Sequence, residues 1–156
     1  MDTQSAQRAF QAALDAPGDD ENSFFLARLF GFRVEADEEV SRLTFTVQDT
    51  MRNPHGTLHG GVIALALDTC MGALLRAALG PSVTVSMTVN YIRPVKDGEV
   101  RCEARFLQSG KTVSHAEARM TDAEGKPVAA VVAADEMTAL AALERERVAR
   151  IFRGTP

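Results

Sequence analysis

A polar, glycine-rich loop, "NPHGTLHGG" at residues 53–61, contains the residues best suited to bind a reactive carbonyl group. It leads directly into an apolar run that fits a helix. The first backbone N–H groups of a helix have no intrahelical partner, and this end of the helix carries a partial positive charge. Both features suit a carbonyl oxygen that becomes an oxyanion, and Gly60 and Gly61 would let a ligand approach the backbone closely. A tight turn without a ligand is the alternative explanation for the two glycines.

Asp68 is a carboxylate in the middle of the apolar run from Gly60 to Leu79. Burying a lone carboxylate is costly, so Asp68 must be paired, hydrogen-bonded or exposed in a wet cleft. The nearest basic residue along the run, Arg76, lies beyond the i,i+4 spacing that allows helical pairs to form. Asp68 is therefore a candidate catalytic residue, and a structural salt bridge to a distant strand is the alternative.

Other catalytic and metal-binding patterns are weaker. His55 and His59 have the spacing of a helical metal pair, but the proline and glycine around His55 make this stretch a loop. The chain has no Gly-x-Ser-x-Gly elbow, Gly-x-Gly-x-x-Gly or Walker motif. Cys70 and Cys102 lie in apolar segments without Cys-x-x-Cys spacing, which is typical of buried, reduced thiols. We expect no metal site and no cofactor.

The elements that position these residues follow from the hydrophobic periodicity. The run 60–79 predicts a long helix that is apolar on most faces and ends at Gly80-Pro81. Before it, 30–40 and 41–50 predict a hairpin. After it, alternating apolar and polar residues separated by glycine-containing turns predict about four antiparallel strands. In the first of these strands the apolar Val83, Val85 and Met87 alternate with the polar Thr84 and Ser86.

These elements predict an α+β fold, in which an antiparallel sheet of about five to six strands wraps around one long central helix. The 156 residues suffice for one such domain, expected at 23–137. Residues 1–22 predict an N-terminal extension with a short helix. Residues 138–156 predict an amphipathic helix that docks on the domain or on a neighbouring subunit.

The overall charge limits the classes of partner. The net charge is −4 and no block of Lys or Arg is present, which argues against a nucleic acid or an anionic membrane surface. The start of the sequence, "MDTQSAQRAF", lacks the features of a secretory signal. We therefore expect a cytoplasmic protein.

Three stretches carry a resemblance to a known family: "NPHGTLHGGVIALALD", "VSMTVNYIRPVKDGEV" and "FLQSGKTVSHAEARMTDAEGKPVA". Together they resemble the hotdog-fold acyl-CoA thioesterases of the PaaI-like (phenylacetate-pathway) type, over roughly residues 24–137. The resemblance implies a hotdog fold, the same architecture that the periodicity indicates. It also implies homodimers, often paired into homotetramers, with active sites at the dimer interface. Asp68 would then lie in a cleft that faces the partner subunit.

The resemblance also implies roles for individual residues. Asp68 matches the catalytic carboxylate, which either attacks the thioester or activates water. Gly60 matches the residue whose backbone amide polarises the thioester carbonyl. Asn53 matches the asparagine that positions the carbonyl or the water, and His59 the histidine beside the oxyanion site. Thr84 falls where related enzymes carry a Ser or Thr that holds the water.

The reaction that we expect is hydrolysis of an acyl-CoA thioester to a free acid and coenzyme A, which is part of the substrate. Because coenzyme A is strongly anionic and the protein is acidic, a local basic patch must bind it. Arg93 and Lys96 are the candidates, with Arg52 and Lys111 behind them, and Gly61 would allow the ligand to approach closely. A carrier-protein thioesterase, a hotdog hydratase or a non-catalytic acyl-CoA-binding domain are the alternatives.

Overall fold

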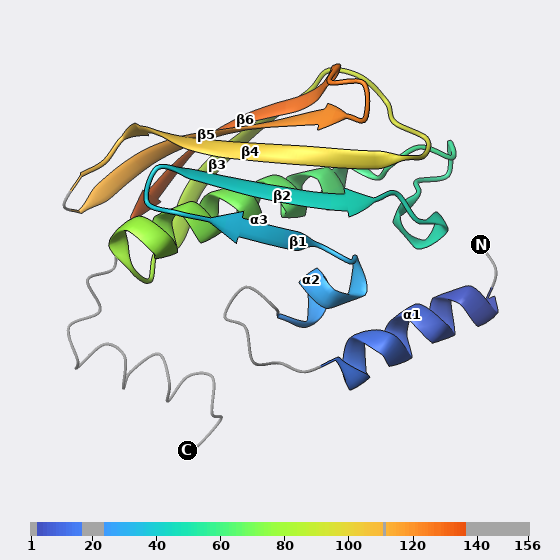
Figure 1. Cartoon of the computed structure of the whole chain (residues 1–156). Coiled ribbons are helices and arrows are strands. Elements are labelled where there is room, and N and C mark those ends of the chain that lie inside the picture. The colour runs from blue at the N-terminus through green and yellow to red at the C-terminus, as the bar shows by residue number, and fades with distance from the viewer. Residues whose placement is uncertain (1–2, 17–23, 111, 137–156) are drawn as a thin grey trace.

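The computed structural model describes residues 3–16, 24–110 and 112–136, which form three α-helices, one 3-10 helix and six strands (Figure 1). In chain order these are α1 (Thr3–Asp15), α2 (Phe25–Leu29), β1 (Arg33–Ala36), β2 (Val40–Thr46), η1 (Asp49–Met51), α3 (Gly60–Leu79), β3 (Val83–Tyr91), β4 (Glu99–Gln108), β5 (Val113–Asp122) and β6 (Pro127–Glu136).

The six strands form one antiparallel sheet in the order β1-β2-β4-β5-β6-β3. The long helix α3 runs beneath the sheet and contacts β1 to β5 (Figure 1). The predicted α+β hotdog architecture is therefore confirmed. The strand β3 follows α3 directly, but among the described strands it pairs only with β6, so it forms one edge of this sheet.

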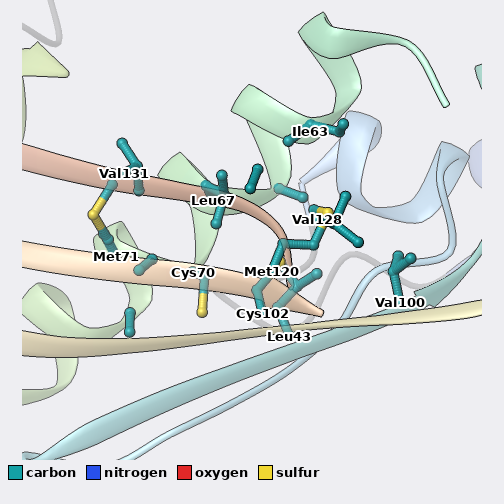
Figure 2. Packing of buried hydrophobic residues seen from close by; sticks show 14 of the residues in the cluster. Leu43, Ile63, Leu67, Cys70, Met71, Val100, Cys102, Met120, Val128 and Val131 are labelled. Atoms are coloured by element: carbon teal, nitrogen blue, oxygen red, sulfur yellow. The ribbon is translucent and has the colours of Figure 1, made fainter. Parts of the chain in front are cut away.

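The core lies between the sheet and one face of α3. Side chains of the helix, among them Ile63, Leu67 and Met71, pack against buried side chains from the strands (Figure 2). The opposite face of α3, which includes Leu65 and Asp68, is only half-buried. We expected burial on most faces, so a larger part of this helix is accessible than its composition indicates.

The helix α3 is long and apolar enough to cross a membrane by length and composition alone, with a mean hydropathy of 1.8. Half of that window is buried within the molecule. The same composition is found in the core helix of a globular domain, and the sheet around α3 accounts for it.

The structure describes part of the predicted N-terminal extension and none of the predicted C-terminal helix. The helix α1 lies within the expected N-terminal extension and packs on α2, where the rings of Phe10 and Phe25 meet edge to face at 5.3 Å. The sequence did not predict α2. The predicted C-terminal helix at 138–156 lies outside the described residues, and the domain boundaries stay predictions.

Candidate active site

Asp68 has a hydroxyl partner rather than a cation. Its Oδ1 accepts a hydrogen bond from the Thr84 hydroxyl at 2.8 Å. Both residues line a groove of about 620 Å³. Within the described residues Asp68 makes no ion pair, so the salt bridge that would have explained it structurally is not found there. The carboxylate is tolerated on this apolar helix because it faces a groove and accepts a hydrogen bond.

The groove extends along α3 beyond the carboxylate. Its other lining residues come from the start of α2, from α3 and from the turn before β3: Phe24, Leu65, Thr69, Gly72, Arg76, Pro81 and Ser82. A Cβ atom added at Gly72 would meet no atom within 4 Å. This glycine therefore leaves open space in the wall of the groove.

An irregularity in β3 orients Thr84 towards α3. Thr84 pairs with Asp135 and Ser86 pairs with Ala134, so β3 has one residue, Val85, more than β6 has between these pairs. Such a β-bulge changes the face of the sheet to which the side chains beyond it point. Thr84 consequently shares the helix-facing side with Asp135, and Val85 is 59% exposed. The alternation predicted from the sequence, which places Thr84 on the same face as Ser86, is wrong at this position.

The start of α3 leaves one backbone donor unused. His59 is the N-cap, and its Nδ1 accepts a hydrogen bond from the Gly61 N–H at 2.9 Å. The amides of Val62 and Ile63 donate to the His59 carbonyl oxygen. The Gly60 N–H makes no hydrogen bond within the described residues. Gly60 therefore supplies the available donor at this helix end, whereas the Gly61 amide is occupied.

The contact with Gly61 also constrains His59. A neutral imidazole has one nitrogen that accepts and one that donates. Because Nδ1 accepts from the Gly61 N–H, the proton of a neutral His59 is on Nε2. His59 thus presents a second N–H donor near the start of α3.

Tyr91 is a residue of this site that the sequence did not reveal. Its hydroxyl donates to the Gly60 carbonyl oxygen at 3.1 Å, and its ring would lie 3.3 Å from a Cβ atom at position 60. Glycine at 60 therefore leaves room for the tyrosine ring. The alternation of β3 indicates on which face Tyr91 lies, but no local signal indicates which turn of α3 it contacts.

Asn53 is occupied by the loop that precedes α3. Its Oδ1 accepts from the backbone N–H groups of His55 and Thr57 at 2.9 and 3.2 Å, and its Nδ2 donates to the Thr57 hydroxyl at 2.9 Å. It makes no hydrogen bond with Asp68 or Thr84. The structure gives Asn53 a role in shaping the loop, and its contact with a substrate stays a prediction.

The cations proposed to bind coenzyme A do not form a cluster of unpaired charges. Arg93 donates to the Asp122 carboxylate at 2.6 Å and to the Pro127 carbonyl oxygen at 3.4 Å. Arg52 forms an ion pair with Asp49 at 3.1 Å. Lys96 is exposed, and Lys111 lies outside the described residues. The binding of coenzyme A by Arg93 and Lys96 stays a prediction, and the Asp122 carboxylate offsets the charge of Arg93.

Comparisons with known proteins find similarity to thioesterases and esterases. Residues 55–129 match the family described as the Thioesterase superfamily. Acyl-coenzyme A thioesterase 13 of Homo sapiens is 36% identical over 87 residues, which cover 53% of this chain and 62% of the human protein. This chain therefore spans less than two thirds of that relative's length.

A second relative and a solved structure cover more of the chain. A putative esterase of Halobacterium salinarum is 30% identical over 126 residues, which cover 75% of this chain and 78% of the esterase. The structure of the PaaI protein from the phenylacetic acid degradation operon of E. coli has a TM-score of 0.69 and 22% identity, covering 84% of this chain and 94% of that protein. At this identity the structure supports the fold alone.

Proposed function

The chain belongs to the thioesterase superfamily, and we propose that it hydrolyses an acyl-CoA thioester to a free acid and coenzyme A. The observation that carries this proposal is the Asp68 carboxylate, held by the Thr84 hydroxyl in a groove along α3. The first amide of this helix, that of Gly60, has no partner among the described residues. A thioester carbonyl is already electrophilic. One oxyanion donor and one carboxylate therefore suffice for its hydrolysis.

In the proposed mechanism the Gly60 N–H donates to the thioester carbonyl oxygen and stabilises the negative charge that develops there. Asp68 either takes a proton from the attacking water or attacks the carbonyl carbon itself. The Thr84 hydroxyl occupies Oδ1 of Asp68, so Oδ2 is the oxygen that meets the water or the carbonyl carbon. The thiolate of coenzyme A then leaves. On the general-base route the proton that Asp68 took from water restores the neutral thiol. On the nucleophilic route the thiolate takes a proton from the medium, and water hydrolyses the mixed anhydride formed on Asp68, which releases the free acid and regenerates the carboxylate.

Steady-state release of free thiol from a panel of acyl-CoA compounds tests this proposal. We expect turnover with at least one aromatic or aliphatic acyl-CoA and no requirement for an added metal or cofactor. Parallel assays use carrier-protein thioesters and enoyl-CoA hydration. Activity confined to one of those assays, or tight acyl-CoA binding without turnover, would contradict the proposal and support the corresponding alternative.

We propose that the active site includes two subunits. Asp68 lies eight residues after Gly60, which corresponds to about 12 Å along a helix. A donor must lie about 3 Å from the oxygen that it stabilises, so the Gly60 amide and the Asp68 carboxylate of one chain do not reach the same carbonyl group. We therefore propose that Asp68 of one subunit acts with Gly60 of a second copy of the chain. The exposed edge strand β3, with Val83 54% exposed, supports such pairing.

We expect the protein to be at least a homodimer at micromolar concentration, and dimers that pair into tetramers also fit the proposal. Sedimentation of the protein over a dilution series measures the assembly, with activity assayed in parallel. A monomer of 16.8 kDa that retains full activity would contradict the shared site.

Subunit mixing tests the shared site directly. The variants Asp68→Asn and Gly60→Pro should each be inactive alone. If each site takes Asp68 from one subunit and Gly60 from the other, mixed dimers contain one intact site. Random exchange of equal amounts should then restore about one quarter of the wild-type activity. Failure to regain activity, after exchange has been verified, would show that both groups come from the same chain.

A further inference from the structure

A second carboxyl group, that of Asp135, lies behind the Asp68–Thr84 pair. Asp135 is in β6 directly opposite Thr84 in β3, and it is 2% exposed. Its Oδ2 is buried without a hydrogen-bond partner in the described part of the chain. The proposed mechanism makes no use of this residue. A buried, incompletely satisfied acid next to a candidate catalytic group requires an explanation.

The Thr84 side chain lies between the two carboxyl groups, on α3 and on β6. It donates to Asp68 Oδ1 at 2.8 Å, and Asp135 lies directly opposite it in β6. A hydroxyl has one proton, so it donates to only one acceptor at a time. If both acids were ionised, one carboxylate would face the lone pairs of the Thr84 oxygen. A proton retained on one of the two acids removes this conflict.

The surroundings indicate which acid keeps the proton. Asp68 opens onto the groove, whereas Asp135 is enclosed. Burial raises the pKa of the Asp135 carboxyl above its ordinary value, and the nearby negative charge of Asp68 on α3 raises this pKa as well. The hydrogen bond with Thr84 and the charge of His115 on β5 lower the pKa but do not reverse the shift. On β3, the residue opposite Asp135 is Thr84, which is uncharged. On α3, Arg76 lines the groove.

Ser114, the other residue paired with Asp135, does not connect Asp135 to Asp68. Ser114 of β5 is paired with Asp135 in the sheet and is fully buried, but its hydroxyl donates to the Gly110 carbonyl oxygen and accepts from the Gly110 N–H. Thr84 is therefore the side chain through which Asp135 can act on the site.

We propose that Asp135 stays protonated in the working enzyme and is a positioning residue for Asp68. Its carboxylic acid donates to the Thr84 oxygen, and the Thr84 hydroxyl then always donates to Asp68 Oδ1. This directional chain fixes the orientation of the Asp68 carboxylate and leaves Oδ2 to face the water or the thioester. The inference rests on the proposed function for its catalytic consequence and on the geometry of three side chains for its protonation state.

Two substitutions at one position test the catalytic consequence. Asp135→Asn keeps a donor towards Thr84, so kcat should stay within about threefold of wild type. Asp135→Ala removes the donor and should lower kcat about tenfold with little change in KM. In a Thr84→Val background, Asp135→Ala should have no further effect.

The wild-type kcat should fall as the pH rises through the raised pKa of Asp135, and Asp135→Asn should lack this decline. Ser114→Ala, which alters the same layer without touching Thr84, should keep the wild-type pH profile.

Stability as a function of pH tests the protonation state without any substrate. A pKa raised in the folded state contributes stability below the ordinary value of 3.8 and loses it as the pH rises through the folded value. The unfolding equilibrium of wild type should therefore shift towards the unfolded state relative to Asp135→Asn, by about tenfold per pH unit in this range. Thermal and denaturant unfolding at equal protein concentration measure this difference.

The outcomes separate this inference from the proposed function. If no thioester is hydrolysed, the proposed function fails, and the unfolding series still decides whether Asp135 retains its proton. A difference between wild type and Asp135→Asn that stays flat or changes in favour of wild type as the pH rises would overturn the protonated state. Equal losses of kcat in Asp135→Asn and Asp135→Ala, or no loss in either, would overturn the positioning role.

Discussion

Replacing Asp68 with Asn should lower kcat by about 100- to 10,000-fold while acyl-CoA binding survives. The substitution keeps the shape of the side chain and removes its negative charge. The Asn oxygen can still accept the hydrogen bond that the Thr84 hydroxyl donates to Asp68 Oδ1. The loss should therefore reflect the missing base or nucleophile, with the hydrogen bond on that side of the groove retained.

Two measurements on this variant separate catalysis from structure. Thermal unfolding reports stability, and release of free coenzyme A reports turnover. A structural Asp68 predicts a lower melting temperature with unchanged activity per folded molecule. Thr69→Val is a matched control, because Thr69 is the next residue on α3 and lines the same groove, and it should keep most of the turnover. Normal turnover from a folded Asp68→Asn protein would end the catalytic assignment.

The period of the hydrophobic residues was sufficient to predict the central helix and the sheet. Gly60-Gly61 and Gly80-Pro81 mark the two ends of α3, and the alternation of apolar and polar residues marks the long strands. The first hairpin is shorter than 30–40 and 41–50 because its second segment continues into η1, Asp49–Met51. The helix α2 has only five residues and no side-chain cap, so a local signal for it is weak.

The candidate site depended more on the family resemblance and on long-range pairing. Alternation alone puts Thr84 on the wrong face, because the bulge at Val85 arises from pairing with β6, which is distant in sequence. The resemblance selected Thr84 as the residue that holds the water. In the structure the Thr84 hydroxyl donates to Asp68, and its contact with water stays a prediction. Asp135 follows a run of Ala and Val near the end of a strand. Nothing in that local pattern shows that its carboxyl group lies beside Thr84.

Charge and residue type alone did not reveal which contacts Arg93 and Asn53 make within the chain. Arg93 was selected as a basic residue after a strand end, but its ion pair with Asp122 is a contact between segments far apart in sequence. An asparagine side chain can contact a substrate, and it can also stabilise a turn by hydrogen bonds to the nearby backbone. The structure shows the second use, with both polar atoms of the Asn53 side chain engaged in the loop.

Replacing Gly60 with Pro should lower turnover by about 100- to 1000-fold, because it deletes the N–H donor at the start of α3 that has no partner in the described part of the chain. The fold should tolerate the change. Proline is favoured at the first helical position, and His59 already has the extended backbone, φ −67° and ψ 134°, that a residue before proline adopts. Neither a backbone hydrogen bond nor the helix geometry is lost within the described residues.

Gly60→Ala is the matched control for this variant. Any Cβ atom at position 60 would lie 3.3 Å from the Tyr91 ring, so the ring must shift by a few tenths of an ångström in both variants. Tyr91 is 57% exposed, so its side chain has space to move. Because Gly60→Ala retains the N–H, the ratio of kcat between the two variants isolates the contribution of the donor. If Gly60→Ala loses as much turnover as Gly60→Pro, displacement of Tyr91 is the cause. If a folded Gly60→Pro protein turns over normally, the oxyanion donor is another group.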